Sequence, residues 1–156
     1  MSYDPEGALG AGIFAGVLVT LFLYIFLAFF PRVKLNLLHL LGTLLPVSHW
    51  WQTYPLGLLI LLALGGGLSM IHAAMYEALR IETNIVAWGL VFGLAQWLVV
   101  GFLMGPISKY HPRIKVGEAD DLGYFAVNER LVAATAFLVL QVVFAVCSGT
   151  FYDALR

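Results

Sequence analysis

The sequence predicts an all-α integral membrane protein whose chain crosses the bilayer four times. Hydrophobic residues make up 62% of the chain and charged residues only 11%, whereas a soluble chain is about a quarter charged. Every Lys, Arg, Asp and Glu lies outside four apolar stretches. Each stretch is about as long as the ~20 residues that a helix needs to cross hydrocarbon. The predicted spans are 9–30, 56–76, 85–107 and 131–152.

A single membrane domain over residues 1–156 is expected, because there is too little charge to cover a separate soluble core. The net charge of −1 provides no surface for nucleic acid. The N-terminal segment carries Asp4 and Glu6 and lacks the basic region of a signal peptide, so the first stretch is expected to remain as a span. Cys147 is the only cysteine, which excludes a disulfide within the chain.

Charge and proline predict the boundaries and the orientation. The prolines are expected to lie outside the spans, since a mid-span proline removes a backbone hydrogen bond that lipid cannot replace. Pro31 and Pro106 would close spans and Pro55 would open one.

The basic residues are concentrated on one side of the membrane. That side holds Arg32, Lys34, Lys109, Arg113, Lys115 and Arg130, and the other holds Arg80 and Arg156. By the positive-inside rule, loops 31–55 and 108–130 are cytoplasmic and both termini lie outside, in a bacterial inner membrane.

The segment 32–45 predicts a short amphipathic helix at the interface or re-entering the membrane. Arg32, Asn36, His39 and Thr43 recur at helical spacing among leucines, and about 14 residues are too few to cross. Trp50, Trp51 and Tyr54 follow, as in an aromatic belt that anchors a span. The alternative is a shelf that docks a partner or lipid.

The loop 108–130 is the main polar insert, basic first and acidic later, with Gly117 and Gly123 as expected turns. Such a loop is typical of a solvated face or of contact with a soluble partner. His111, Asp120 and Asp121 could meet a metal ion, but their spacing matches no known ligand set, so no metal site is predicted.

Small residues recur at four-residue spacing in two spans and predict close helix–helix faces. They do not decide whether the facing helix belongs to this chain or to another subunit. The glycines expected to form these faces are Gly12, Gly16, Gly89, Gly93, Gly101 and Gly105.

Four polar side chains within the spans are the candidate functional residues. Gln96 and Gln141 fall near mid-membrane and should bond each other, a backbone carbonyl or water, because an unpaired amide in hydrocarbon is costly. His72 and Tyr76 lie one turn apart in the second span and could bind haem or quinone or relay a proton. Ordinary packing of His72 is the main alternative, since His39, His49 and His111 map to the opposite side and supply no second axial ligand at that depth.

Three motifs resemble those of uncharacterised four-helix bacterial inner-membrane proteins of the DUF6789-like kind. They are Gly12-Ile13-Phe14-Ala15-Gly16, His72-Ala73-Ala74-Met75-Tyr76, and Gly89-Leu90-Val91-Phe92-Gly93 followed by Trp97. The resemblance covers about half of the chain and implies a four-helix bundle. It implies no activity and transfers no functional residue.

The sequence favours a non-catalytic accessory subunit of a larger membrane complex, such as one of respiratory or photosynthetic electron transfer. It would meet other subunits and lipid through its helix faces. The first alternative is a small transporter or channel using Gln96 and Gln141. The second is a quinone- or haem-associated redox protein using His72. No nucleophile–base pair, phosphate-binding loop or metal signature appears, so no catalytic residue and no metal ligand is assigned.

Overall fold

The computed structural model describes residues 3–45 and 49–155. Within that part of the chain every regular element is helical. In chain order the elements are α1 (Pro5–Phe29), α2 (Leu37–Gly42), α3 (Trp50–Ala78), α4 (Ile85–Tyr110), α5 (Pro112–Lys115), the 3-10 helix η1 (Tyr124–Glu129) and α6 (Leu131–Leu155).

Four of these helices, α1, α3, α4 and α6, are long and apolar enough to cross a membrane, which confirms the predicted fold class. The shortest contain 25 residues. At ~1.5 Å per residue such a helix extends ~37 Å, which exceeds the ~30 Å thickness of the hydrocarbon core. Each helix can therefore place its ends among the lipid headgroups.

Two prolines lie inside helices, contrary to the sequence-based boundaries. Pro55 lies in the second turn of α3, which begins at Trp50, and Pro106 lies near the end of α4, which continues to Tyr110. The fixed φ of proline is compatible with a helix, and its main cost is the hydrogen bond that it removes. Near a helix end this single loss does not stop the helix.

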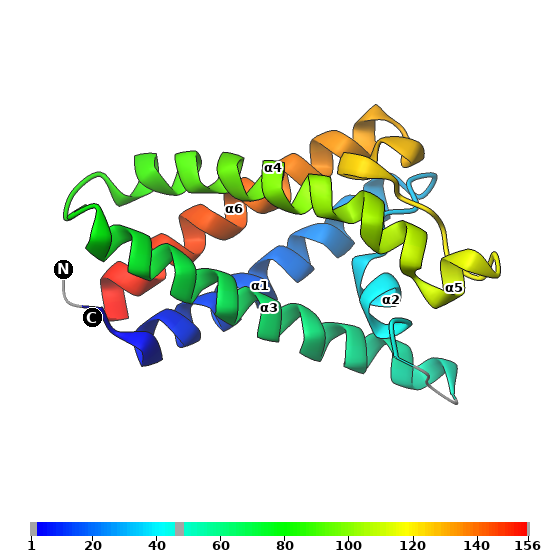
Figure 1. Ribbon diagram of the computed structural model, residues 1–156, viewed down its shortest axis with the longest axis horizontal. Coiled ribbons are helices and arrows are strands. Elements are labelled where there is room, and N and C mark those ends of the chain that lie inside the picture. Colours follow the sequence, from blue (N-terminus) through cyan, green and yellow to red (C-terminus); the bar gives the residue numbers. More distant parts are fainter. Residues whose placement is uncertain (1–2, 46–48, 156) are drawn as a thin grey trace.

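The termini share one end of the molecule with the turn between α3 and α4, and the other loops gather at the opposite end (Figure 1). We call these the terminal end and the loop end. At the terminal end, Asp4 accepts hydrogen bonds from the backbone N–H groups of Glu6 and Gly7 and so caps α1. The Asp4 N–H donates to the Tyr152 hydroxyl at 3.0 Å, which links the start of α1 to the end of α6.

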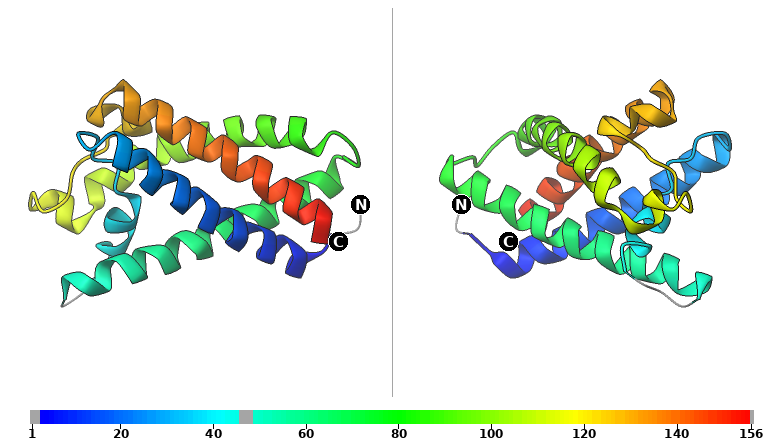
Figure 2. Two further views of the ribbon diagram at one scale, coloured as in Figure 1. Left: turned by 180° about the vertical axis from the view of Figure 1, so that it is seen from behind. Right: turned by 45° about the vertical axis from the view of Figure 1, so that its right-hand side comes forward.

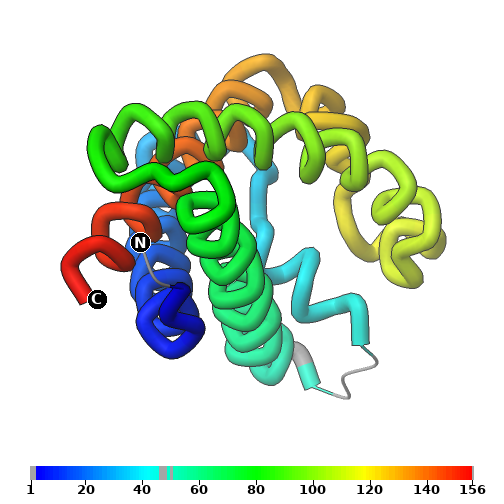
Figure 3. Tube along the Cα trace, turned by 60° about the vertical axis from the view of Figure 1, so that its left-hand side comes forward, coloured from blue at the N-terminus to red at the C-terminus, as the bar shows by residue number. Residues whose placement is uncertain are grey.

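The long helices pack in the order α3, α1, α6, α4, with α1 and α6 side by side in the middle (Figure 2). The outer helices α3 and α4 meet near their connecting turn, where Phe92 of α4 contacts the rings of His72 and Tyr76. Farther from the turn they diverge and make little direct contact within the described residues (Figure 3). Between their loop ends lies α2, which packs on α3 and bonds His111 through the Leu40 carbonyl, so this side of the bundle is open only along the middles of α3 and α4.

The segment between α1 and α3 contains a short helix, as predicted, but within narrower bounds than residues 32–45. Only Leu37–Gly42 is helical, and it packs against the first half of α3. A Cβ atom added at Gly57 would lie 1.9 Å from the Leu38 carbonyl oxygen, and one added at Gly42 would lie 1.9 Å from that of Thr53. The two backbones thus touch, which ties α2 closely to α3.

The polar stripe of this segment also serves internal contacts. The Asn36 side chain caps α2 and donates to the Tyr54 hydroxyl at 3.1 Å, and the Thr43 hydroxyl donates to the His39 carbonyl at 2.7 Å. Side-chain bonding to nearby backbone and to α3 explains the same residues.

The loop 111–130 folds back against α4 and α6. Gly117 and Gly123 adopt positive φ, as turns require, and two exposed ion pairs, Lys34–Asp120 and Arg113–Glu118, lie across its surface. The hydrogen bond and charge of Asp120 raise the pKa of Lys34 above its usual value. Phe125 and Ala126 adopt left-handed backbone angles that cost each non-glycine residue roughly 1 kcal/mol. The packing of this loop on α4 offsets that cost.

Candidate functional site

Four of the six predicted glycines form close helix–helix faces within this chain. A Cβ atom at Gly12 would lie 2.4 Å from the Gly65 carbonyl oxygen on α3. Cβ atoms at Gly89 and Gly93 would lie 2.9 Å and 2.7 Å from Cα atoms of α6. Gly16 also faces α3, where an added Cβ would meet the Leu62 side chain at 3.0 Å. These faces join α1 to α3 and α4 to α6.

Gly101 and Gly105 face aromatic rings of the loop rather than another helix. A Cβ at Gly101 would lie 2.1 Å from the Phe125 ring, and one at Gly105 would lie 2.3 Å from the Tyr124 ring. Both rings belong to η1. The expectation of a helix face was wrong here because a glycine stripe accepts any flat group, and sequence spacing does not distinguish a ring from a helix.

The mid-membrane amides contact each other directly. The Gln96 side chain on α4 donates from Nε2 to Oε1 of Gln141 on α6. Gln96 is 7% exposed, and its own Oε1 has no hydrogen-bond partner among the described residues. The bond ties α4 to α6 in the same interface as Gly93.

His72 and Tyr76 lie one turn apart on α3 and point into the core formed with α4 and α6. Their side chains are 5% and 1% exposed. The His72 ring lies 5.5 Å from the Phe92 ring and 6.4 Å from the Phe144 ring, centre to centre. The Tyr76 ring lies 5.0 Å from that of Phe92. The two polar side chains are therefore enclosed by aromatic rings.

Neither side chain satisfies its hydrogen-bonding capacity. His72 Nδ1 and the Tyr76 hydroxyl are buried without a partner among the described residues. A buried polar atom without a partner costs about 1–3 kcal/mol, so each such atom needs an explanation. Space is tight around the hydroxyl, since a Cβ at Gly149 would approach it to 2.5 Å.

A bis-histidine haem does not fit this site. His39, on α2, and His49 and His111, which cap α3 and α5, all lie at the loop end, whereas His72 lies two turns from the end of α3 at the terminal end. His111 is engaged in structure: its Nδ1 accepts the backbone N–H groups of Arg113 and Ile114, and its Nε2 bonds the Leu40 carbonyl at 2.9 Å.

A metal site is likewise missing from the described part of the chain. Those residues contain no group of three or more His, Cys, Asp or Glu side chains that could hold a metal ion, so His111, Asp120 and Asp121 are not brought together as ligands. Cys147 is half-buried and packs against the apolar core. Its surroundings are those of a small hydrophobic residue.

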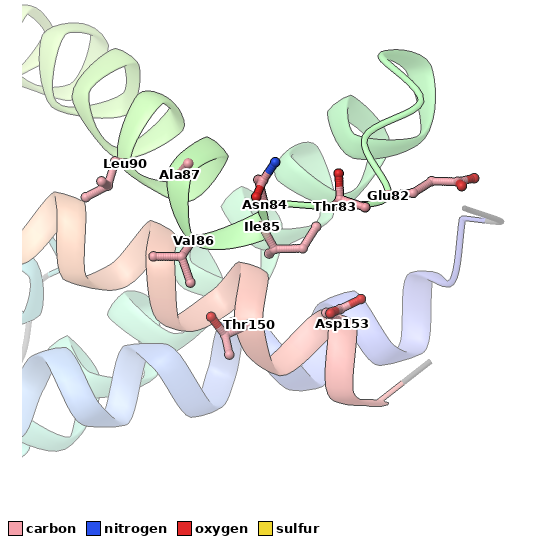
Figure 4. A pocket seen from close by; sticks show the side chains of 9 residues that line it. All are labelled: Glu82, Thr83, Asn84, Ile85, Val86, Ala87, Leu90, Thr150 and Asp153. Carbon is pink, nitrogen blue, oxygen red and sulfur yellow. The ribbon is translucent and has the colours of Figure 1, made fainter.

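A hollow at the terminal end was not predicted from the sequence (Figure 4). It measures about 560 Å³ and lies between the turn before α4 and the last turns of α6. Its polar lining consists of Glu82, Thr83, Asn84, Thr150 and Asp153, and its apolar lining includes Val86 and Leu90. Its only local sequence signal is Asn84, a residue tolerant of the left-handed backbone angles that it adopts here. The hollow is open to the surface and lies away from His72.

Fold and site define an all-α integral membrane protein with four candidate spans and a small polar cluster within them. No protein-family model, curated protein or solved structure matches the chain. The resemblance to DUF6789-like proteins therefore stays a prediction.

Proposed function

We propose that the protein is a non-catalytic structural subunit of a larger assembly in a bacterial inner membrane, with its loop end in the cytoplasm. The open side of the bundle is the observation that carries this proposal. The outer helices α3 and α4 each pack mainly on one other long helix, α1 and α6 respectively. A transmembrane helix of another subunit, packed along the exposed middles of α3 and α4, would complete the bundle.

The contacts of the packing glycines change which helix surface is expected to meet a partner subunit. Gly12, Gly16, Gly89 and Gly93 are used inside the chain, so they are not free to receive another subunit. The surface left for a partner consists of bulky side chains, such as Leu64 on α3 and Val99 on α4, which are 52% and 60% exposed. Association in lipid would then depend on van der Waals contact between such side chains.

The test is purification of the protein from its native membrane in mild detergent, with photo-crosslinking residues at Leu64 and at Val99. The matched control is Phe22 on α1, which is 51% exposed on a helix packed on two sides. Defined partner subunits crosslinked from Leu64 and Val99 but not from Phe22 support the proposal. A monodisperse species of monomer mass with no co-purifying subunit refutes it.

A second candidate is binding of a small hydrogen-bonding molecule, such as the head group of a quinone, at His72 and Tyr76. The unpartnered His72 Nδ1 and Tyr76 hydroxyl favour it, and the rings of Phe92 and Phe144 lie beside the site. The test compares quinone binding by the purified protein with that of His72→Leu and Tyr76→Phe variants. Equal binding by all three proteins would remove this candidate.

A further inference from the structure

Two lysines at the loop end converge on one exposed aromatic ring. Tyr110, the last residue of α4, is 70% exposed. The Lys109 ammonium lies 6.0 Å and the Lys115 ammonium 5.6 Å from the centre of its ring. Like charges repel, so two ammonium groups beside one ring create a locally positive surface that an anion would stabilise.

The neighbouring cations are neutralised, but these two are not. Lys34 pairs with Asp120 at 3.0 Å, and Arg113 pairs with Glu118. Within the described residues Lys109 and Lys115 form no ion pair with a carboxylate. The unsatisfied positive charge of the α4–α5 corner is therefore concentrated at Tyr110.

The surface beside this corner is apolar and continuous with the span. Leu103, Ile107 and Tyr110 follow one another at helical spacing on α4 and are 52%, 44% and 70% exposed. A chain of apolar side chains thus leads out of the hydrocarbon to an amphipathic ring and then to two ammonium groups. Tyrosine at this depth is typical of the level of the lipid headgroups.

We propose that Lys109, Tyr110 and Lys115 form a binding site for the phosphate of an anionic phospholipid. Its acyl chain would lie along Leu103 and Ile107, and its phosphodiester would accept hydrogen bonds from the two ammonium groups. The Tyr110 ring contacts the glycerol region between them. The site depends on the fold alone and is independent of any partner subunit.

The test is titration of the delipidated full-length protein with phosphatidylglycerol or phosphatidylcholine, followed by native mass spectrometry. Each lysine contributes roughly fivefold to the affinity of a basic site for anionic lipid, so the Lys109→Gln/Lys115→Gln variant is expected to bind phosphatidylglycerol about 25-fold more weakly. Both side chains are exposed, so the variant should fold normally, which circular dichroism checks.

The matched control is Arg32→Gln/Arg130→Gln, which removes the same charge from exposed positions at the same end of the molecule. It is expected to leave phosphatidylglycerol binding within about twofold of the unmodified protein. Equal losses in the two variants would mean general attraction of charge and would overturn the site, as would equal binding of phosphatidylcholine. Glycerol 3-phosphate should not displace the lipid, and displacement would instead identify a free-phosphate site.

Discussion

Replacing Gly12 by alanine tests the close contact between α1 and α3. The added Cβ would lie 2.4 Å from the Gly65 carbonyl oxygen, 2.6 Å from Ser69 Cβ and 2.8 Å from Gly66 Cα. The optimal separation of such atoms is about 3.5 Å, so the shortest contact must lengthen by about 1 Å. Two of the three neighbours are backbone atoms that cannot rotate away, and the helices themselves must separate.

Gly67 supplies the matched control, because a Cβ added there meets nothing within 4 Å. Both substitutions replace a helical glycine by alanine, which by itself favours the helix by about 0.5–1 kcal/mol. That term cancels in the difference between the two variants. Overpacking typically costs 1–3 kcal/mol, so Gly12→Ala is expected to be less stable than Gly67→Ala by about that amount.

The assay is reversible unfolding in mixed micelles, followed by circular dichroism, for the unmodified protein and both variants. The expected difference corresponds to roughly a 5- to 150-fold change in the folding equilibrium constant. If Gly12→Ala and Gly67→Ala agree within about 0.5 kcal/mol, α1 and α3 do not pack through Gly12 and this reasoning fails.

Three further predictions concern the buried polar groups and the loop. Gln96→Leu and Gln141→Leu should each lower the free energy of unfolding. The double variant should lower it by about 0.6–1.7 kcal/mol less than the sum of the two single effects, as a double-mutant cycle measures. Additive effects would contradict the bond between the two side chains. Tyr76→Phe removes a hydroxyl without a described partner and should be neutral or stabilise by up to about 3 kcal/mol in thermal unfolding, and clear destabilisation would instead reveal a bound water or ligand. Phe125→Ala vacates the face of Gly101 and should lower stability by about 3 kcal/mol in the same measurement; an unchanged melting temperature would show that the loop is not held there.

The spans were predictable because lipid imposes a strong one-dimensional rule. A helix that crosses hydrocarbon must be long and carry its few charges near its ends, and the four helices obey this rule. Boundaries were less predictable at Pro55 and Pro106, since a proline near a helix end stops a helix only when other contacts agree. The turns at Gly117 and Gly123 followed from local chemistry and were correctly expected.

The sequence identified which residues belong to the candidate site, but it did not predict which side chains surround them. Scarcity of polar groups in apolar spans singled out His72, Tyr76, Gln96 and Gln141. Their partners depend on which helices pack together, and sequence periodicity places no helix beside another. The Phe92 ring beside His72 and Tyr76 carries no polar signal that could have marked it.

By itself the sequence determined the class of the protein, the number of spans and the placement of both termini at one end. These features follow from the solvation of side chains and backbone in lipid, which each segment obeys independently. Tertiary structure alone decided that Gly12, Gly16, Gly89 and Gly93 pack against helices of the same chain. It also decided that Gly101 and Gly105 contact aromatic rings and that the segment after α1 packs against α3. Such outcomes depend on contacts between atoms distant in sequence, and lipid, being as apolar as the helices, supplies no hydrophobic force that would impose them segment by segment.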